Sequence, residues 1–126
     1  MKEKLTPVFA LFLLLGCGVA QEFVAVPPNV NRESVPKLSI ELTAERFRFT
    51  PEVVRVTQGT LVTLKIKAID GTHGFRLDAF GIDESIEENK TKDVEFYAGE
   101  KGEYGFKCSH FCGLGHFGMT GKVIVE

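Results

Sequence analysis

Between residue 38 and the C-terminus, hydrophobic and polar residues alternate in short runs. Alternation with a period of two residues is typical of β-strands that bury one face. Because several short strands with turns about every 8–12 residues are typical of two packed sheets, the sequence predicts an all-β, antiparallel sandwich of about seven strands. The hydrophobic positions fall at Leu38, Ile40 and Leu42; Phe47 and Phe49; Val54 and Val56; Val62, Leu64 and Ile66; Val94 and Phe96; Tyr104 and Phe106; and Val123 and Val125.

One stretch within this region lacks the alternation. Residues 78–90 carry five acidic side chains and no regular pattern. We expect an exposed loop here, with a short edge strand at Ser85–Ile86 as an option. No stretch of the chain has a helical period.

The N-terminus predicts export from the cytoplasm. Lys2 and Lys4 precede an apolar run, Leu5 to Leu15, which is shorter than the roughly 20 residues of a membrane span and typical of a signal peptide. The run ends at Gly16–Cys17 and resembles a bacterial lipoprotein signal, which implies cleavage after residue 16 and acylation of Cys17. An ordinary signal peptide and an uncleaved anchor remain open, and all three readings place the domain outside the cytoplasm.

The segment that follows predicts a spacer between membrane and domain. Residues 17–37 contain Pro27, Pro28 and Pro36 and show no periodicity, which indicates a flexible tether ahead of a domain at 38–126. A lipid at Cys17 would hold the domain at the membrane. The net charge of −2 and the lack of a basic stripe argue against a nucleic-acid partner. The sequence contains no acid–base pair or nucleophile motif that would predict an enzyme.

Candidate chemistry gathers near the C-terminus, between runs that predict strands at 103–107 and 121–126. Cys108, Cys112, His116 and Met119 lie within twelve residues. Thiolate, imidazole and thioether together favour copper or zinc. Zinc sites take Cys, His or carboxylate ligands, whereas copper also takes a weak axial Met. Met119 therefore favours copper.

The remaining ligands are expected from outside the loop and from its backbone. His73 is the one histidine outside the loop, and it lies at a strand end, where it supplies a second imidazole. Two thiolates separated by three residues can both bridge two copper ions. Each ion would then take one histidine and one weak axial group. Met119 supplies one axial group, and a backbone carbonyl of the loop can supply the other.

This pattern, Cys-x3-Cys-x3-His-x2-Met with an upstream histidine, resembles the CuA domain of cytochrome c oxidase subunit II, which also occurs in nitrous oxide reductase. The resemblance implies a Greek-key cupredoxin-like fold and a centre of two copper ions that carries one electron. It also implies an extracytoplasmic place in a respiratory chain, with a c-type cytochrome or another redox protein and heme-copper oxidase subunits as partners. The implied ligands are Cys108 and Cys112 as bridging thiolates, His73 and His116 as terminal imidazoles, and Met119 and the backbone carbonyl of His110 as axial groups.

The sequence departs from this family at two points. The carbonyl position often carries a Glu whose side chain binds magnesium, but here it is His110, so no magnesium is expected and the imidazole has no assigned role. The family often has a Trp at its electron-entry surface, and this chain has none. We expect Phe111, Leu114 and Phe117 to form an apolar docking patch instead.

Several alternatives remain open on the sequence alone. Cys108 and Cys112 can pair as a disulfide in an oxidising compartment, which leaves His116 and Met119 unexplained. A structural zinc site built from two Cys and two His leaves Met119 unexplained. A copper chaperone or buffer would use the same ligands as an electron carrier. A free-standing carrier and a non-catalytic electron-entry subunit of an oxidase are equally compatible with the pattern.

Overall fold

The structure, a computed structural model, describes residues 24–126. These residues form nine β-strands and two short 3₁₀-helices, and the predicted signal peptide and Cys17 lie outside them. The elements are β1 (Lys37–Glu45), β2 (Arg48–Thr50), β3 (Val53–Val56), β4 (Thr60–Ala68), β5 (His73–Leu77), η1 (Asp78–Phe80), β6 (Ile82–Ile86), β7 (Thr91–Ala98), β8 (Gly102–Lys107), η2 (His116–Gly118) and β9 (Thr120–Val125).

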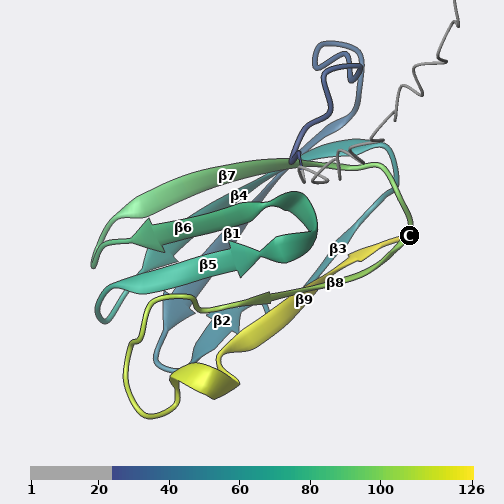
Figure 1. Cartoon of the computed structure of the whole chain (residues 1–126). Coiled ribbons are helices and arrows are strands. Elements are labelled where there is room, and N and C mark those ends of the chain that lie inside the picture. The colour runs from purple at the N-terminus through teal and green to yellow at the C-terminus, as the bar shows by residue number, and fades with distance from the viewer. Residues whose placement is uncertain (1–23) are drawn as a thin grey trace, which may run out of the picture.

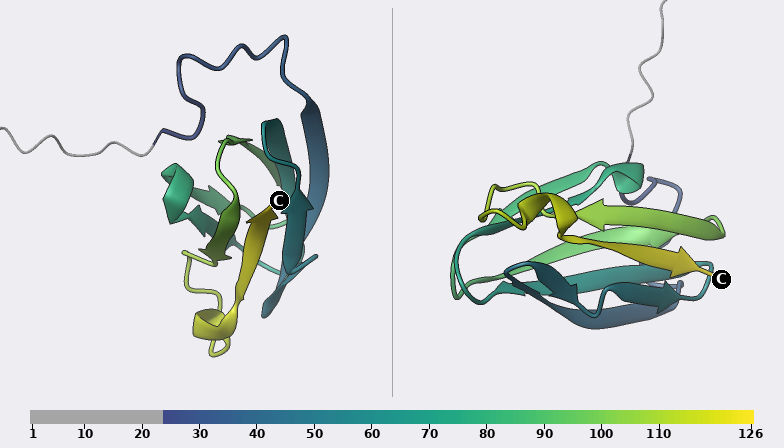
Figure 2. Two further views of the ribbon diagram at one scale, coloured as in Figure 1. Left: turned by 90° about the vertical axis from the view of Figure 1, so that its right-hand side faces the viewer. Right: turned by 90° about the horizontal axis from the view of Figure 1, so that it is seen from below.

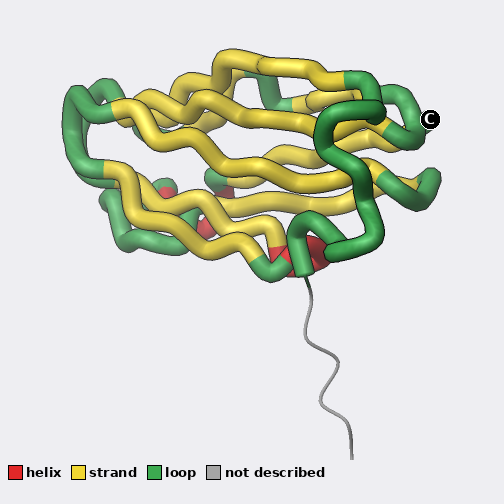
Figure 3. Tube along the Cα trace, turned by 90° about the horizontal axis from the view of Figure 1, so that it is seen from above, coloured by secondary structure: helices red, strands yellow, loops and turns green. Residues whose placement is uncertain are grey.

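The strands form two sheets that pack face to face, which confirms the predicted all-β sandwich (Figures 1 and 3). One sheet has the order β2-β1-β4-β7 and the other β3-β9-β8-β5-β6. The prediction of purely antiparallel pairing was wrong at two pairs, because β1 pairs with β4 and β3 with β9 in parallel. After the β1–β2 hairpin the chain crosses to the second sheet as β3, and β4 then returns beside β1 in the same direction.

Two further strands occupy the stretch around residues 73–90. β6 pairs with β5 along its whole length, so much of the segment expected as an exposed loop is an edge strand. Ile82 and Ile86 point into the core, while the acidic side chains between them face outward or lie at the edge. Because only two apolar residues mark this strand, its period of two is hard to detect in the sequence.

The core confirms the alternation at most other positions, but Leu38 and Phe47, which were expected on buried faces, are 38% and 40% exposed. In β4, Leu64 and Ile66 are buried while Lys65 and Lys67 are exposed. Phe49, Phe75 and Phe106 cluster between the sheets, with ring centroids 5.0–5.9 Å apart. These aromatic contacts fix the spacing of β2, β5 and β8, which lie under the candidate site.

The loop that carries the candidate ligands and the N-terminal segment lie far apart. In Figure 1 the loop between β8 and β9 is at the lower left, and residues 24–36 are at the upper right; Figure 2 also separates them. Within the predicted tether, the Ala25 carbonyl accepts a hydrogen bond from the Tyr97 amide, and the Pro36 carbonyl from the Leu61 amide. Among residues 24–126, no helix is long and apolar enough to cross a membrane.

Candidate metal centre

The candidate ligands lie on a loop that is closed at its base. β8 ends at Lys107 and β9 begins at Thr120, and the Cys108 amide donates a hydrogen bond of 3.0 Å to the Met119 carbonyl between them. Inside this neck, the His116 amide donates to the Gly113 carbonyl at 3.1 Å and begins the short helix η2. The two sheet strands therefore hold both ends of a compact twelve-residue loop, an arrangement that fixes side chains without using core volume.

The structure brings the predicted donor atoms together. The Sγ atoms of Cys108 and Cys112 are 3.7 Å apart, and both thiols are free and buried. Nδ1 of His73 lies 3.9 Å from the first sulfur, and Nδ1 of His116 lies 3.7 Å from the second. The ligand atoms of His73 and the two cysteines all lie within 4.8 Å of one another.

Each of the two predicted weak donors lies near a different cysteine sulfur. The carbonyl oxygen of His110 is 3.1 Å from the Cys108 sulfur, and Sδ of the fully buried Met119 is 3.9 Å from the Cys112 sulfur. The His110 imidazole is exposed, so only the backbone of that residue contributes to the cluster. The four other predicted donors therefore surround the pair of cysteine sulfur atoms.

His73 reaches the cluster from the neighbouring strand and is oriented by a carboxylate. It is the first residue of β5 and is completely buried, with Nε2 2.8 Å from Oδ1 of Asp70. A hydrogen bond at Nε2 leaves Nδ1 free to face the sulfur atoms. Desolvation opposes ionisation of Asp70, but hydrogen bonds from His73 and from the Arg46 amide together lower the pKa of the carboxyl below its usual value.

The backbone of β5 also approaches the loop closely at Gly74. Its amide donates to the Cys108 sulfur at 3.4 Å, a contact that stabilises a thiolate. A Cβ atom at this position would lie 2.2 Å from Ser109 Oγ and 2.5 Å from the His110 amide nitrogen. Only glycine therefore lets the loop lie against the strand.

The environment of Cys112 favours the thiol unless a cation is present. Burial, with a smaller contribution from the hydrogen bond to Cys108, raises the pKa of Cys112 to about 11. A bound metal ion reverses this preference, because a coordinating thiol loses its proton.

The donor set fits a soft or borderline metal. Two metal–thiolate bonds of about 2.3 Å span up to about 4.6 Å, so sulfur atoms 3.7 Å apart can share an ion. Two sulfurs, two imidazoles, a thioether and a carbonyl favour copper over the hard cations. Among residues 24–126, His73, Cys108 and Cys112 form the one group of at least three His, Cys, Asp or Glu side chains close enough together to hold a metal ion.

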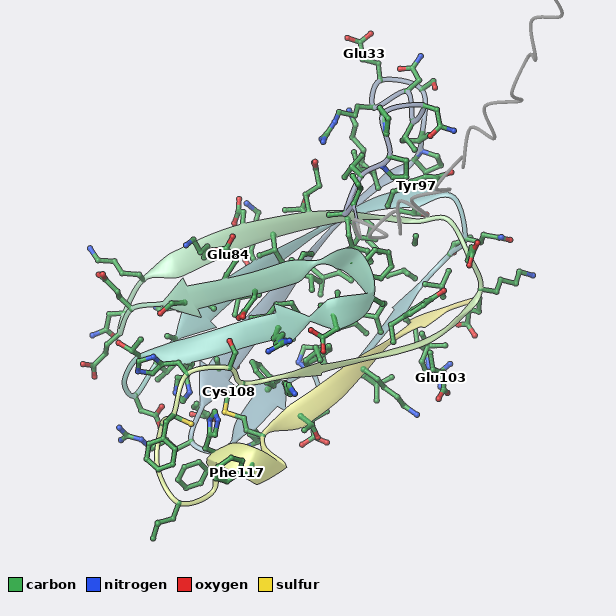
Figure 4. All side chains as sticks on the ribbon, in the orientation of Figure 1. Glu33, Glu84, Tyr97, Glu103, Cys108 and Phe117 are labelled. Atoms are coloured by element: carbon green, nitrogen blue, oxygen red, sulfur yellow. The ribbon has the colours of Figure 1, made fainter. Side chains whose placement is uncertain are left out.

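Apolar side chains cover the outside of the loop. Phe111 is 62% exposed, Leu114 97% and Phe117 84%. The rings of Phe111 and Phe117 lie 5.5 and 5.0 Å from the ring of His116. Figure 4 shows Phe117 at the outer edge of the loop and Cys108 deeper inside. We call these three residues the apolar patch, and its place beside His116 agrees with the expectation from the sequence.

Three residues near the centre were missed at the sequence level. Asp70 supports His73, and Arg46 donates through Nε to the Cys112 carbonyl at 2.8 Å. The ring of Phe47 lies against the loop glycines, because a Cβ atom at Gly115 would come within 2.3 Å of it. Asp70 had a local signal, since it precedes His73 by three residues. Arg46 and Phe47 had none, because the loop they touch is more than 60 residues away.

A β-sandwich that carries thiol, imidazole and thioether donors on a loop between two strands is typical of copper-binding domains. A model of the cupredoxin-like domain matches residues 7–125, and the chain belongs to that family.

Individual relatives narrow the comparison. The chain is 29% identical over 107 residues to cytochrome c oxidase subunit 2 of Thermus thermophilus, a match that covers 85% of this chain and 74% of that protein. It spans 60% of a second subunit 2 sequence from that species. The periplasmic domain of subunit II of cytochrome oxidase (CoxB) of Bradyrhizobium japonicum has a similar fold, with a TM-score of 0.66 and 19% identity over 71% of this chain and 83% of that one.

A neighbour described as a blue copper protein shows what the fold alone leaves undecided. Auracyanin A, described as a blue copper protein from Chloroflexus aurantiacus, matches with a TM-score of 0.58 and 21% identity over 71% of this chain and 99% of that one. Because the same sandwich occurs in a blue copper protein and in oxidase subunits, the number of metal ions has to be argued from the donor atoms.

Proposed function

We propose that this protein is a one-electron carrier with a binuclear, CuA-like copper centre. The observation that carries the proposal is the pair of free sulfur atoms, 3.7 Å apart, with one imidazole beside each. A single-copper site needs one thiolate, whereas this arrangement gives each of two ions both sulfurs and a histidine of its own. The copper, when bound, supplies reversible one-electron chemistry.

The chain's own residues have separate roles in this proposal. Cys108 and Cys112 would hold the ions together, and His73 and His116 would each supply one further ligand. Met119 and the His110 carbonyl would be weak donors that tune the potential rather than hold the metal. Since the donors belong to a closed loop and one strand end, they stay in place when the charge of the centre changes.

The surface supports electron transfer with a transient partner. The apolar patch surrounds His116, which is only partly buried and lies between the centre and the outside. A small apolar contact of less than about 1,200 Å² suits a redox encounter that must also dissociate quickly. We propose that a c-type cytochrome or another redox protein donates the electron and that a heme-copper oxidase accepts it. This protein would be either a subunit of that oxidase or a separate partner of it.

Cellular placement follows from the N-terminal prediction and from the relatives. We propose an extracytoplasmic domain held at the membrane by a lipid on Cys17. The Ala25 carbonyl is hydrogen-bonded to the Tyr97 amide, so the stretch from Cys17 to Ala25 would set the reach of the domain, at most about 26 Å when fully extended.

The number and electronic state of the copper ions test the proposal. The protein is loaded with copper under mild reduction, and metal stoichiometry and the electron paramagnetic resonance (EPR) spectrum are measured. We expect two copper ions per chain, a purple colour and one unpaired electron shared by both ions. A blue protein with a single copper ion would refute the binuclear centre, and a colourless protein that keeps zinc would favour the structural zinc site.

A further inference from the structure

Arg46 lies outside the predicted ligand set but contacts both sides of the candidate centre. It belongs to the turn between β1 and β2, and its Nε donates to the Cys112 carbonyl at 2.8 Å. Its backbone amide donates to both carboxylate oxygens of Asp70, at 3.1 and 2.9 Å. One residue thus joins the ligand loop to the turn that precedes His73.

The Asp70 contact extends this connection to a ligand. Oδ1 of Asp70 lies 2.8 Å from Nε2 of His73, so the residue that Arg46 holds is the one that orients this imidazole. The guanidinium also lies against Gly71, where an added Cβ atom would be 2.9 Å from Nη2. Arg46 therefore fixes three points: the loop carbonyl, the carboxylate and the turn between them.

The charge of Arg46 also acts on the centre. A guanidinium stays protonated at every physiological pH. Its Nε lies 2.8 Å from the Cys112 carbonyl, so this positive charge lies beside one of the two cysteines of the candidate centre. Adding an electron to a metal centre lowers its charge by one, so a fixed positive charge nearby favours the reduced state.

We propose that Arg46 is a positioning residue of the metal centre, which holds the Cys112 side of the loop against the Asp70–His73 side and favours the reduced state through its charge. This inference rests on the proposed copper function. Two separable effects follow: the hydrogen bond to the carbonyl orders the loop, and the charge shifts the potential.

Three variants separate these effects. Arg46→Gln removes the charge and the Nε donor but keeps the backbone amide on Asp70. Arg46→Lys keeps the charge and removes the planar guanidinium. Arg48→Gln is the matched control. Arg48 lies two residues further along the chain and its side chain is 67% exposed; within residues 24–126 its one ion pair is with Glu45, at 3.9 Å.

The first measurement needs no metal. Amide hydrogen exchange over residues 109–115 is followed in the copper-free, reduced protein. Both Arg46 variants should exchange about fivefold faster than the parent protein, since a single hydrogen bond contributes about 1 kcal/mol and 1.4 kcal/mol is a factor of ten. Arg48→Gln should match the parent protein. Equal exchange in all four proteins would overturn the positioning role.

The second measurement uses the copper-loaded protein. Arg46→Gln should lower the equilibrium constant for one-electron reduction of the centre about threefold to tenfold. At about 59 mV per factor of ten, this lowers the reduction potential by about 30 to 60 mV. Arg46→Lys should stay close to the parent value. A potential in Arg46→Gln equal to that of Arg48→Gln would overturn the electrostatic effect, whereas failure of the parent protein to bind two ions would refute the proposed function and leave the exchange result standing.

Discussion

Gly74→Ala tests whether the close contact between β5 and the ligand loop sets the geometry of the centre. The new methyl carbon would lie 2.5 Å from the His110 amide nitrogen and 2.7 Å from that of Ser109, both of them backbone atoms. Ordinary contact begins at 3.4 Å, so the loop must retreat by about 0.9 Å. Overpacking of this kind costs about 1–3 kcal/mol. For a domain of this size, that lowers the Tm by about 4–12 °C.

The same displacement should reach the metal. The retreating segment carries the His110 carbonyl, which is 3.1 Å from Cys108 Sγ, and the Gly74 amide lies 3.4 Å from the same sulfur. We therefore expect altered copper hyperfine splitting in the EPR spectrum in addition to the lower Tm. Calorimetry and EPR of the same sample measure both effects.

Gly118→Ala is the matched control for this substitution. Gly118 lies in the same loop, in η2, and a Cβ atom there would meet nothing within 4 Å. Its Tm and spectrum should equal those of the parent protein. If Gly74→Ala behaved like Gly118→Ala, the loop would be free to move away from β5 without consequence, and the argument for a rigidly held centre would be refuted.

Three other predictions address single groups. Cys112→Ser should abolish the two-copper EPR signal, because one bridging sulfur is lost; retention of that signal would contradict the bridging role. Met119→Leu conserves volume and should cost less than about 1.5 kcal/mol, keep the two-copper signal and shift the potential, so loss of metal would refute an axial role. Burial raises the pKa of Cys112 to about 11 in the folded protein. As the pH rises, the unfolded chain therefore loses the Cys112 thiol proton at a lower pH than the folded protein does. The metal-free protein should therefore lose stability between about pH 9 and 11 in urea titrations, and Cys112→Ser should remove that loss.

The sequence predicted the sandwich because its signal is local. Alternation in β1, β4 and β7 reports directly which face of each strand is buried, so strand positions followed without knowledge of their partners. Strand direction is a property of pairing and leaves no local trace. The parallel pairs β1–β4 and β3–β9 were therefore missed, and only the Ser85–Ile86 end of the weakly alternating edge strand β6 was anticipated.

In the candidate site, too, the residues with a local sequence signal were predicted and those without one were missed. Four side-chain donors lie on one short loop, and their spacing made them visible in the sequence. His73 was found only because the loop required another imidazole. Arg46 acts through a hydrogen bond to a carbonyl 66 residues away, and neither its residue type nor its neighbours predict that contact.

A copper chaperone and an electron carrier place opposite demands on the same donors, and the surroundings of the ligands distinguish them. A chaperone must release its ion, which favours exposed ligands on a loop that opens easily. Here the Cys108–Met119 hydrogen bond closes the loop at its base, and both cysteines and Met119 are buried. His73 is completely buried and held by Asp70, so one terminal ligand cannot turn away without breaking a hydrogen bond. Only His116 lies partly open to the outside, beside the exposed apolar patch. An electron can pass through the partly exposed His116 while the other ligands keep the metal enclosed. This difference in exposure between His116 and the buried ligands favours an electron carrier over a chaperone.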